Sequence, residues 1–413
     1  MEADDEQGAE APAAQLAPAL SPGPPDCAAA IQPIGFHDGL IKAPLLDQTI
    51  QPRTFERTGE RTAERNGDRN GHAQTYGALD LGTNNCRLLV ARPSRRGFLV
   101  VDAFSRIIRL GEGVSASGRL SDAAMQRTIE ALKVCEAKLR KANVARSRLI
   151  ATQACRVAAN GDEFLARVRN DVGLNIEVVC RETEARLAVS GCAALIDKQS
   201  DLVLVFDIGG GSSELIWLDL NRRRDGWRRS MADRIEAQHC IAAWTSLPVG
   251  VVTIAERFGG RHVDEDGFES MVDYVSDLLA PFEGEHGFRS RMHNRRVHML
   301  GTSGTVTTVA GIHLGLPRYD RNRVDGCWLR SSQVRTVTAD LLARGYDARV
   351  SEPCIGRDRA DLVLAGCAIL EALMRMWPCD MLRVADRGLR EGILATLMAE
   401  DGVFRSSRRD GCQ

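Results

Sequence analysis

The chain has 413 residues, which is long enough for two domains of ordinary size that each bury a core. Its 54 basic and 55 acidic residues give a formal net charge of −1, so the chain lacks the overall field that nucleic-acid or membrane-surface binding usually needs. We therefore expect neither a nucleic acid nor a membrane as partner, and any anionic ligand must be bound by a local group of residues.

The 12 cysteines include no C-x-x-C pair and no zinc-ligand spacing, which is typical of reduced, buried thiols. The acidic start, Met1–Glu6, lacks the basic and apolar regions of a signal peptide. No apolar run approaches the roughly 18 residues that a membrane span needs. These features predict a cytoplasmic protein.

Residues 1–73 are rich in Ala and Pro and then in Arg, Glu, Thr, Gly and Asn. Such a segment buries too little apolar surface to offset its ordering entropy, so we expect a disordered N-terminal tail. Ordered structure should begin near Tyr76, where residues 77–91 are typical of a strand, a tight polar turn and a second strand.

The segment 202–218 repeats this pattern: aligning Asp80 with Asp207 also aligns Gly82 with Gly209, at an offset of 127 residues. A repeat of this length indicates two similar halves, because solenoid repeats are much shorter. We therefore predict a first domain over 74–201, a second over 202–400, and a flexible tail over 401–413.

The remaining pattern alternates helices with strands, which favours a layered α/β fold with largely parallel sheets. Predicted helices cover 121–142 with Ser121 as N-cap, 163–170, 266–282 and 361–376, and predicted strands cover 149–152, 176–179 and 296–300. Residues 221–245 fit no regular period and are interpreted as an insertion or a long connection.

Two acid-headed, Gly-rich turns carry the clearest chemical signal. In the second turn, Gly209, Gly210 and Gly211 allow backbone N–H groups to approach a ligand closely, and Ser212 and Ser213 add hydroxyl donors. The first turn offers a matching set, which consists of Asp80, Gly82, Thr83, Asn84, Asn85 and the adjacent Arg87. Two such turns could grip one chain of phosphates, although either alone could be an ordinary tight turn.

A third turn, residues 301–305, follows a predicted strand and opens a predicted helix, so Gly304 and Thr305 could bind an anion at the helix N-terminus. The same pattern could be only a helix cap. The turn lacks the lysine of a P-loop, which excludes that class of site.

Six motifs in order resemble one family. They are Asp80-Leu-Gly-Thr-Asn-Asn-Cys-Arg, Asp207-Ile-Gly-Gly-Gly-Ser-Ser-Glu-Leu, Leu247-Pro-Val-Gly, Gly301-Thr-Ser-Gly-Thr, Arg359-Ala-Asp-Leu-Val-Leu-Ala-Gly and Asp386-Arg-Gly-Leu-Arg-Glu-Gly-Ile-Leu. Together they resemble the Ppx/GppA phosphatases, which are exopolyphosphatases and guanosine pentaphosphate phosphohydrolases of the actin/Hsp70/sugar-kinase superfamily. The resemblance implies two actin-like α/β domains with a phosphate-binding cleft between them.

The resemblance also implies roles for individual residues. Glu184 matches the catalytic glutamate of the family, and Arg156 matches a substrate-facing arginine. Asp207 and Glu214 match carboxylates associated with Mg²⁺, and Asp80 stands at the equivalent point of the first turn. From the residues alone, Glu184 could be an ordinary first-turn helix acid and Arg156 a surface arginine.

The leading prediction is a Mg²⁺-dependent phosphohydrolase that releases terminal orthophosphate from polyphosphate, from a guanosine penta- or tetraphosphate, or from both. Both substrates present a phosphoanhydride end, so the sequence leaves the choice open. Two alternatives are an ATP-dependent small-molecule kinase of the same superfamily and a non-catalytic nucleotide or polyphosphate sensor. The resemblance also suggests a homodimer.

Overall fold

The computed structural model describes residues 74–94, 97–222 and 236–403. The predicted N-terminal tail lies outside these residues, as do residues 404–413 of the predicted C-terminal tail and much of the predicted insertion. Within the described ranges, no helix is both long enough and apolar enough to cross a membrane.

The first sheet has five strands in the order β3-β2-β1-β4-β5. Their bounds are β1 Tyr76–Leu81, β2 Asn85–Ser94, β3 Gly97–Ile107, β4 Arg146–Ala151 and β5 Glu177–Val178. β1 and β2 form an antiparallel hairpin with Asp80 opposite Arg87, and β1 runs parallel to β4. The hairpin turn therefore lies at the edge of the sheet where β4 also ends.

The second sheet has six strands in the order β10-β11-β9-β6-β7-β8. Their bounds are β6 Leu202–Ile208, β7 Ser213–Asp219, β8 Ile241–Leu247, β9 Val297–Thr302, β10 Trp328–Arg330 and β11 Met381–Ala385. β6 and β7 form an antiparallel hairpin with Asp207 opposite Glu214, and β6 runs parallel to β9. The predicted repeat is therefore a repeat of backbone topology as well.

The described helices of the first part of the chain are α1 Val114–Ser117, α2 Asp122–Lys141, α3 Gln153–Val157, α4 Gly161–Val172 and α5 Arg181–Cys192. The later ones are α6 Val251–Phe258, α7 Glu265–His286, α8 Phe288–Arg291, α9 Gly304–His313, α10 Arg321–Val324, α11 Ser331–Ala343, α12 Tyr346–Val350, α13 Val363–Met376 and α14 Leu389–Glu400. The predicted N-cap is confirmed, because the Ser121 hydroxyl accepts a hydrogen bond from the Ala124 N–H. The interpretation of 221–245 as irregular was wrong at its end, where a short 3-10 helix leads into β8.

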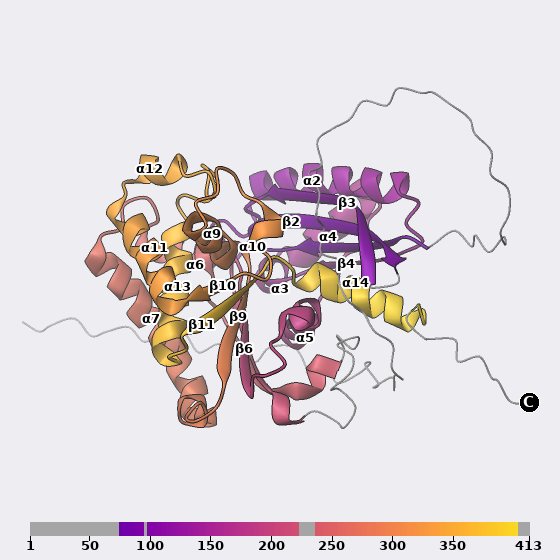
Figure 1. The fold of residues 1–413 in the computed structure, drawn as a ribbon. Helices are drawn as coiled ribbons and strands as arrows, with labels where there is room; N and C mark the ends of the chain where they lie inside the picture. Colours follow the sequence, from indigo (N-terminus) through magenta and orange to yellow (C-terminus); the bar gives the residue numbers. More distant parts are fainter. Residues whose placement is uncertain (1–73, 95–96, 223–235, 404–413) are drawn as a thin grey trace, which may run out of the picture. The chain divides into compact units, whose positions relative to one another are not determined.

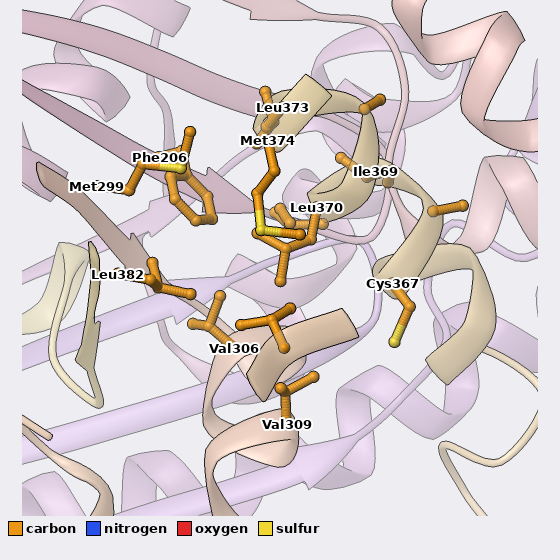
Figure 2. Close-up of a cluster of buried hydrophobic side chains, with 14 of the residues drawn as sticks. Phe206, Met299, Val306, Val309, Cys367, Ile369, Leu370, Leu373, Met374 and Leu382 are labelled. Carbon is orange, nitrogen blue, oxygen red and sulfur yellow. The ribbon is translucent and has the colours of Figure 1, made fainter. Parts of the chain in front are cut away.

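One core lies against the second sheet. Side chains of β6, β9, β11, α9 and α13 meet there, as Figure 2 shows: Phe206, Met299, Leu382, Val306, Val309, Ile369, Leu370, Leu373 and Met374. The α13 segment is almost entirely apolar, which fits a helix buried on most of its surface. This core fixes the turn at 301–305 that opens α9.

The C-terminal helix α14 packs against the first sheet. Ile393 and Leu394 of α14 contact the cluster that contains Tyr76 and Ala78 of β1, and the Tyr76 hydroxyl donates a hydrogen bond to Asp401, 2.8 Å away. Figure 1 shows α14 in yellow beside the strands of the first sheet. Residues 389–400, which the sequence analysis assigned to the second domain, therefore contribute to the core of the first sheet.

Candidate active site

The two Gly-rich turns face each other. A Cβ atom built on Gly210 would lie 3.0 Å from the Thr83 Cβ and 3.1 Å from the Asn84 backbone nitrogen. A Cβ on Gly211 would lie 2.9 Å from the Thr83 Oγ1. Glycine is needed at these positions because the backbone of the second turn approaches the first turn closely.

The turns are also built alike. The Gly82 N–H donates to the Asn85 carbonyl oxygen and the Gly209 N–H donates to the Ser212 carbonyl oxygen, both at 2.9 Å. The N–H groups of Gly210 and Gly211 have no hydrogen-bond partner among residues 74–94, 97–222 and 236–403. Free amides at close-packed glycines are the donors that a phosphate cradle requires.

A cavity of about 120 Å³ lies between the turns. Of the residues predicted from sequence, it is lined by Asp80, Gly82, Thr83, Asn84, Asn85, Arg87, Glu184, Asp207, Gly209, Gly210, Gly211, Ser212, Glu214, Gly304 and Thr305. The structure therefore brings all three predicted turns and the predicted catalytic carboxylate to one place.

Two predicted residues are not among those that line this cavity. Ser213 is buried and its hydroxyl donates to the Val249 carbonyl oxygen, 2.8 Å away, so it holds β7 against the following segment. Arg156 donates to the Val179 carbonyl oxygen and, over 3.1 Å, to a carboxylate oxygen of Glu184. In this structure Arg156 holds the Glu184 carboxylate, and its predicted contact with the substrate stays a prediction.

Glu184 lies in the first turn of α5 and is only 6% exposed. Burial, followed by the negative charge of Glu214, raises the pKa of Glu184 well above its usual range, and Arg156 partly offsets this rise. A carboxylate with a raised pKa is a stronger proton acceptor. By contrast, Glu182 is partly exposed and pairs with Arg186 on the surface of the same helix.

Three more carboxylates line the cavity. Burial raises the pKa of Asp207 to about 7, and Glu214 contributes further to that rise. Burial also raises the pKa of Glu214 and of Asp80, although hydroxyl groups of Ser212 and Ser246 donate to Glu214. The acids thus repel one another in a buried place, which favours the arrival of a cation.

The carboxylates of the cavity suit Mg²⁺ better than they suit a metal ion whose ligands all come from the protein. No group of three His, Cys, Asp or Glu side chains stands ready as a ligand set within the described ranges. Mg²⁺ keeps several waters and needs only one or two carboxylates together with substrate oxygens. Asp207 and Glu214, which face each other across the β6–β7 pair, are suited to that role.

The third turn contributes a strained residue. Ser303, directly before α9, has a φ of 114°, and its buried hydroxyl has no hydrogen-bond partner among the described residues. Non-glycine residues rarely adopt this backbone conformation, and such strain gathers at functional sites. Ser303 lines the cavity beside Gly304 and Thr305, so the start of α9 points at the same space as the two hairpin turns.

Sequence reasoning missed two arginines, Arg359 and Arg390. They lie with Arg87 in the wall of a second cavity of about 450 Å³, which shares Asp80, Arg87 and Asp207 with the first. Both lie in motifs that carry the family resemblance, and the basic residues of those motifs are the only sequence signal that could have indicated a ligand-binding role for them. Their position depends on which face of a turn or helix points inward, and the sequence does not give that.

A family model described as the Ppx/GppA phosphatase family matches residues 89–401, more than half of the chain. The chain belongs to the Ppx/GppA phosphatase family. The match begins after the first turn, so the placement of Thr83 and Asn84 opposite the second turn comes from the structure. Membership of this family makes the protein a phosphatase, and hence a hydrolase.

Solved structures agree with this assignment. A family member from Aquifex aeolicus is 26% identical, with 79% of this chain and 98% of that chain covered and a TM-score of 0.63. An exopolyphosphatase-like protein is also 26% identical, with 79% and 98% covered and a TM-score of 0.66. An exopolyphosphatase from Cytophaga hutchinsonii, 23% identical with 79% and 98% covered and a TM-score of 0.68, shows the same fold. The predicted α/β fold with two actin-like domains is thus confirmed. The prediction of largely parallel sheets was wrong, because hairpins form antiparallel pairs in both described sheets.

Proposed function

We propose that this Ppx/GppA family member is a Mg²⁺-dependent phosphohydrolase that releases terminal orthophosphate from polyphosphate, from guanosine pentaphosphate, or from both. The observation that carries the proposal is the buried Glu184 carboxylate in the wall of a cavity between two facing Gly-rich turns. The similarity to an exopolyphosphatase-like protein that is 26% identical to this chain supports a phosphoanhydride substrate.

Terminal phosphoryl transfer to water needs an oriented water, a proton acceptor and stabilisation of the non-bridging oxygens. Glu184 orients the water and accepts its proton, because burial and Glu214 raise the pKa of Glu184. Arg156 fixes the direction of the Glu184 carboxylate through its 3.1 Å contact. The free N–H groups of Gly210 and Gly211 donate to the phosphate oxygens.

Mg²⁺ would be held by Asp207 and Glu214, with Asp80 close by in the same cavity. When bound, it supplies positive charge to the phosphate oxygens and offsets the repulsion among the buried acids. The hydroxyl groups of Ser212 and Ser246 orient Glu214 toward that role.

The test is the substitution Glu184→Gln, which keeps the shape of the side chain and removes its basicity. We expect kcat for phosphate release to fall by roughly 100-fold or more, with polyphosphate binding retained, because general base catalysis typically contributes about 10²–10⁴. Both long-chain polyphosphate and guanosine pentaphosphate are assayed, with Mg²⁺ and after its removal by a chelator.

Glu182→Gln is the matched control, because Glu182 lies two residues away on α5 but pairs with Arg186 at the surface. It should leave turnover near the parent level. Turnover by Glu184→Gln close to that of the parent, or full activity in the absence of Mg²⁺, would refute the proposal.

A further inference from the structure

Three arginine side chains in the wall of the second cavity have no hydrogen-bond or ion-pair partner among residues 74–94, 97–222 and 236–403. They are Arg87 on β2, Arg359 just before α13, and Arg390 in the first turn of α14. They come from distant parts of the chain. Guanidinium groups that converge with unused hydrogen-bond donors form a site for an anion.

The other two arginines of the cavity wall, unlike these three, are paired with carboxylates. Arg321 donates to a carboxylate oxygen of Glu391 over 2.8 Å, and Arg387 is bonded to Asp325. Since these two are already engaged by acids, they hold the wall of the cavity together. Among the arginines of the described wall, the guanidinium groups without a partner are therefore those of Arg87, Arg359 and Arg390.

The pKa shifts of Arg359 and Arg390 show that their positive charges are unfavourable in this buried place. Burial lowers the pKa of Arg359, and the positive charge of Arg87 lowers it further. Burial also lowers the pKa of Arg390, where the Glu391 carboxylate opposes the effect and Arg87 adds to it. Carboxylates near both arginines, Asp80 beside Arg390 and Asp386 beside Arg359, oppose this effect. Buried guanidinium donors without hydrogen bonds are nevertheless costly, and their retention points to a ligand that accepts those bonds.

The second cavity adjoins the first. Asp80, Arg87, Asp207, Gly304 and Arg359 line both cavities, so a ligand whose end reaches Glu184 can extend past these residues without leaving the protein. The volume of about 450 Å³ lies within the usual range for ligand sites. The ligand that fits is therefore longer than one phosphate.

The cavity favours phosphate groups over a nucleoside. Among its described lining residues the only aromatic side chain is Tyr319, and its hydroxyl donates to Asp386 over 2.7 Å. Base recognition usually relies on aromatic stacking and on free polar edges. Arginine forks, in contrast, match the oxygens of phosphate groups.

We propose that Arg390 binds non-bridging oxygens of phosphate groups beyond the terminal one, in a linear phosphoanhydride chain that runs from the first cavity into the second. This assignment rests on the proposed function, since it takes the end of the same chain to lie at Glu184. It makes Arg390 a residue that determines chain-length preference, because Arg390 lines the second cavity and not the first, whereas Glu184 lines only the first.

Steady-state kinetics test the proposal with Arg390→Gln and three substrates: long-chain polyphosphate, inorganic triphosphate and guanosine pentaphosphate. Loss of a charge-assisted contact should raise KM for the long chain by about tenfold or more. KM for triphosphate and kcat for both inorganic substrates should stay within about twofold. Arg390→Lys, which keeps the charge but loses the fork, should give an intermediate KM. Arg323→Gln, in an exposed position on α10, is the control and should change nothing.

Two further measurements exclude a merely structural role and separate this proposal from the proposed function. Thermal unfolding of Arg390→Gln should occur near the parent temperature, because the Arg390 side chain makes no hydrogen bond or ion pair among the described residues. Calorimetric titration with long-chain polyphosphate, in the absence of Mg²⁺, should show weaker binding by Arg390→Gln even if the parent protein hydrolysed nothing.

Equal changes in KM for all three substrates, unchanged KM, or a marked loss of thermal stability would overturn the role of Arg390. An effect confined to guanosine pentaphosphate would assign the second cavity to a nucleotide and would also overturn the proposal. Failure of the parent protein to release phosphate from any substrate would instead reject the proposed function.

Discussion

The helix that carries Glu184 is held in place by a backbone contact between two glycines. A Cβ built on Gly191 of α5 would lie 1.9 Å from the carbonyl oxygen of Gly388, the residue that precedes α14. Real Cβ contacts essentially never fall below 3.0 Å, so Gly191→Ala must move α5 or the Gly388 turn by more than about 1 Å. Since backbone is on both sides of the contact, no side-chain rotation can relieve it.

The displacement should reach the active site. Glu184 lies seven residues before Gly191 on the same helix, or about 10 Å along its axis. A rigid helix transmits a shift of about 1 Å over this distance, and misplacement of a catalytic group by that amount can cost about 100-fold in rate. We therefore expect kcat for phosphate release to fall by about 10- to 100-fold, with a loss of about 1–3 kcal/mol in unfolding free energy from overpacking.

Gly284→Ala is the matched control, because Gly284 also lies within a helix but a Cβ there meets nothing within 4 Å. This substitution should leave kcat unchanged and raise the unfolding free energy by about 0.4–1 kcal/mol. Phosphate release and urea unfolding are measured for both variants. If Gly191→Ala retained parent activity and were as stable as Gly284→Ala, the coupling between the α5–α14 contact and Glu184 would be refuted.

Two further predictions concern the facing turns and the second sheet. Gly210→Ala should force Thr83 and Asn84 away from the second turn, since its Cβ would lie 3.0–3.1 Å from them. Phosphate release should fall at least about tenfold while the unfolding temperature changes little; unchanged activity would mean that the turns need not meet. Burial lowers the pKa of His298 to about 4, below its ordinary value of 6.5, so the folded state binds fewer protons than the unfolded state. The contribution of His298 to the unfolding free energy should thus be fully present above pH 6.5 and fall by up to about 3 kcal/mol as the pH drops to about 4. Urea titrations over this pH range check the sign, because His298→Gln should lack this decline.

Local chemistry made the hairpins predictable from the sequence. Asp, Gly, Thr, Asn and Ser at fixed offsets specify a tight turn between two apolar runs, and the repeat of that pattern identified two related halves. The cap at Ser121 and the apolar α13 segment are likewise set by neighbours in the chain. Such features depend on interactions over a few residues, so one sequence is enough to reveal them.

Side-chain direction at the site was only partly predictable. Ser212 lies in the turn and Ser213 is the first residue of β7, so these adjacent hydroxyl residues point in different directions: Ser212 lines the cavity and Ser213 donates to Val249. The same limit applies to Arg156, whose contacts with Glu184 depend on how α3 lies beside α5. Composition gives the residue type, but packing decides which way it points.

The sequence by itself determined the two turns, the α/β character and the family motifs, because these are encoded by residues close together in the chain. Only the tertiary structure decided that the turns face each other, that α14 packs on the first sheet, and that Arg87, Arg359 and Arg390 converge on one cavity. The physical reason is that these contacts join segments far apart in the chain, and their geometry is set by the packing of two cores.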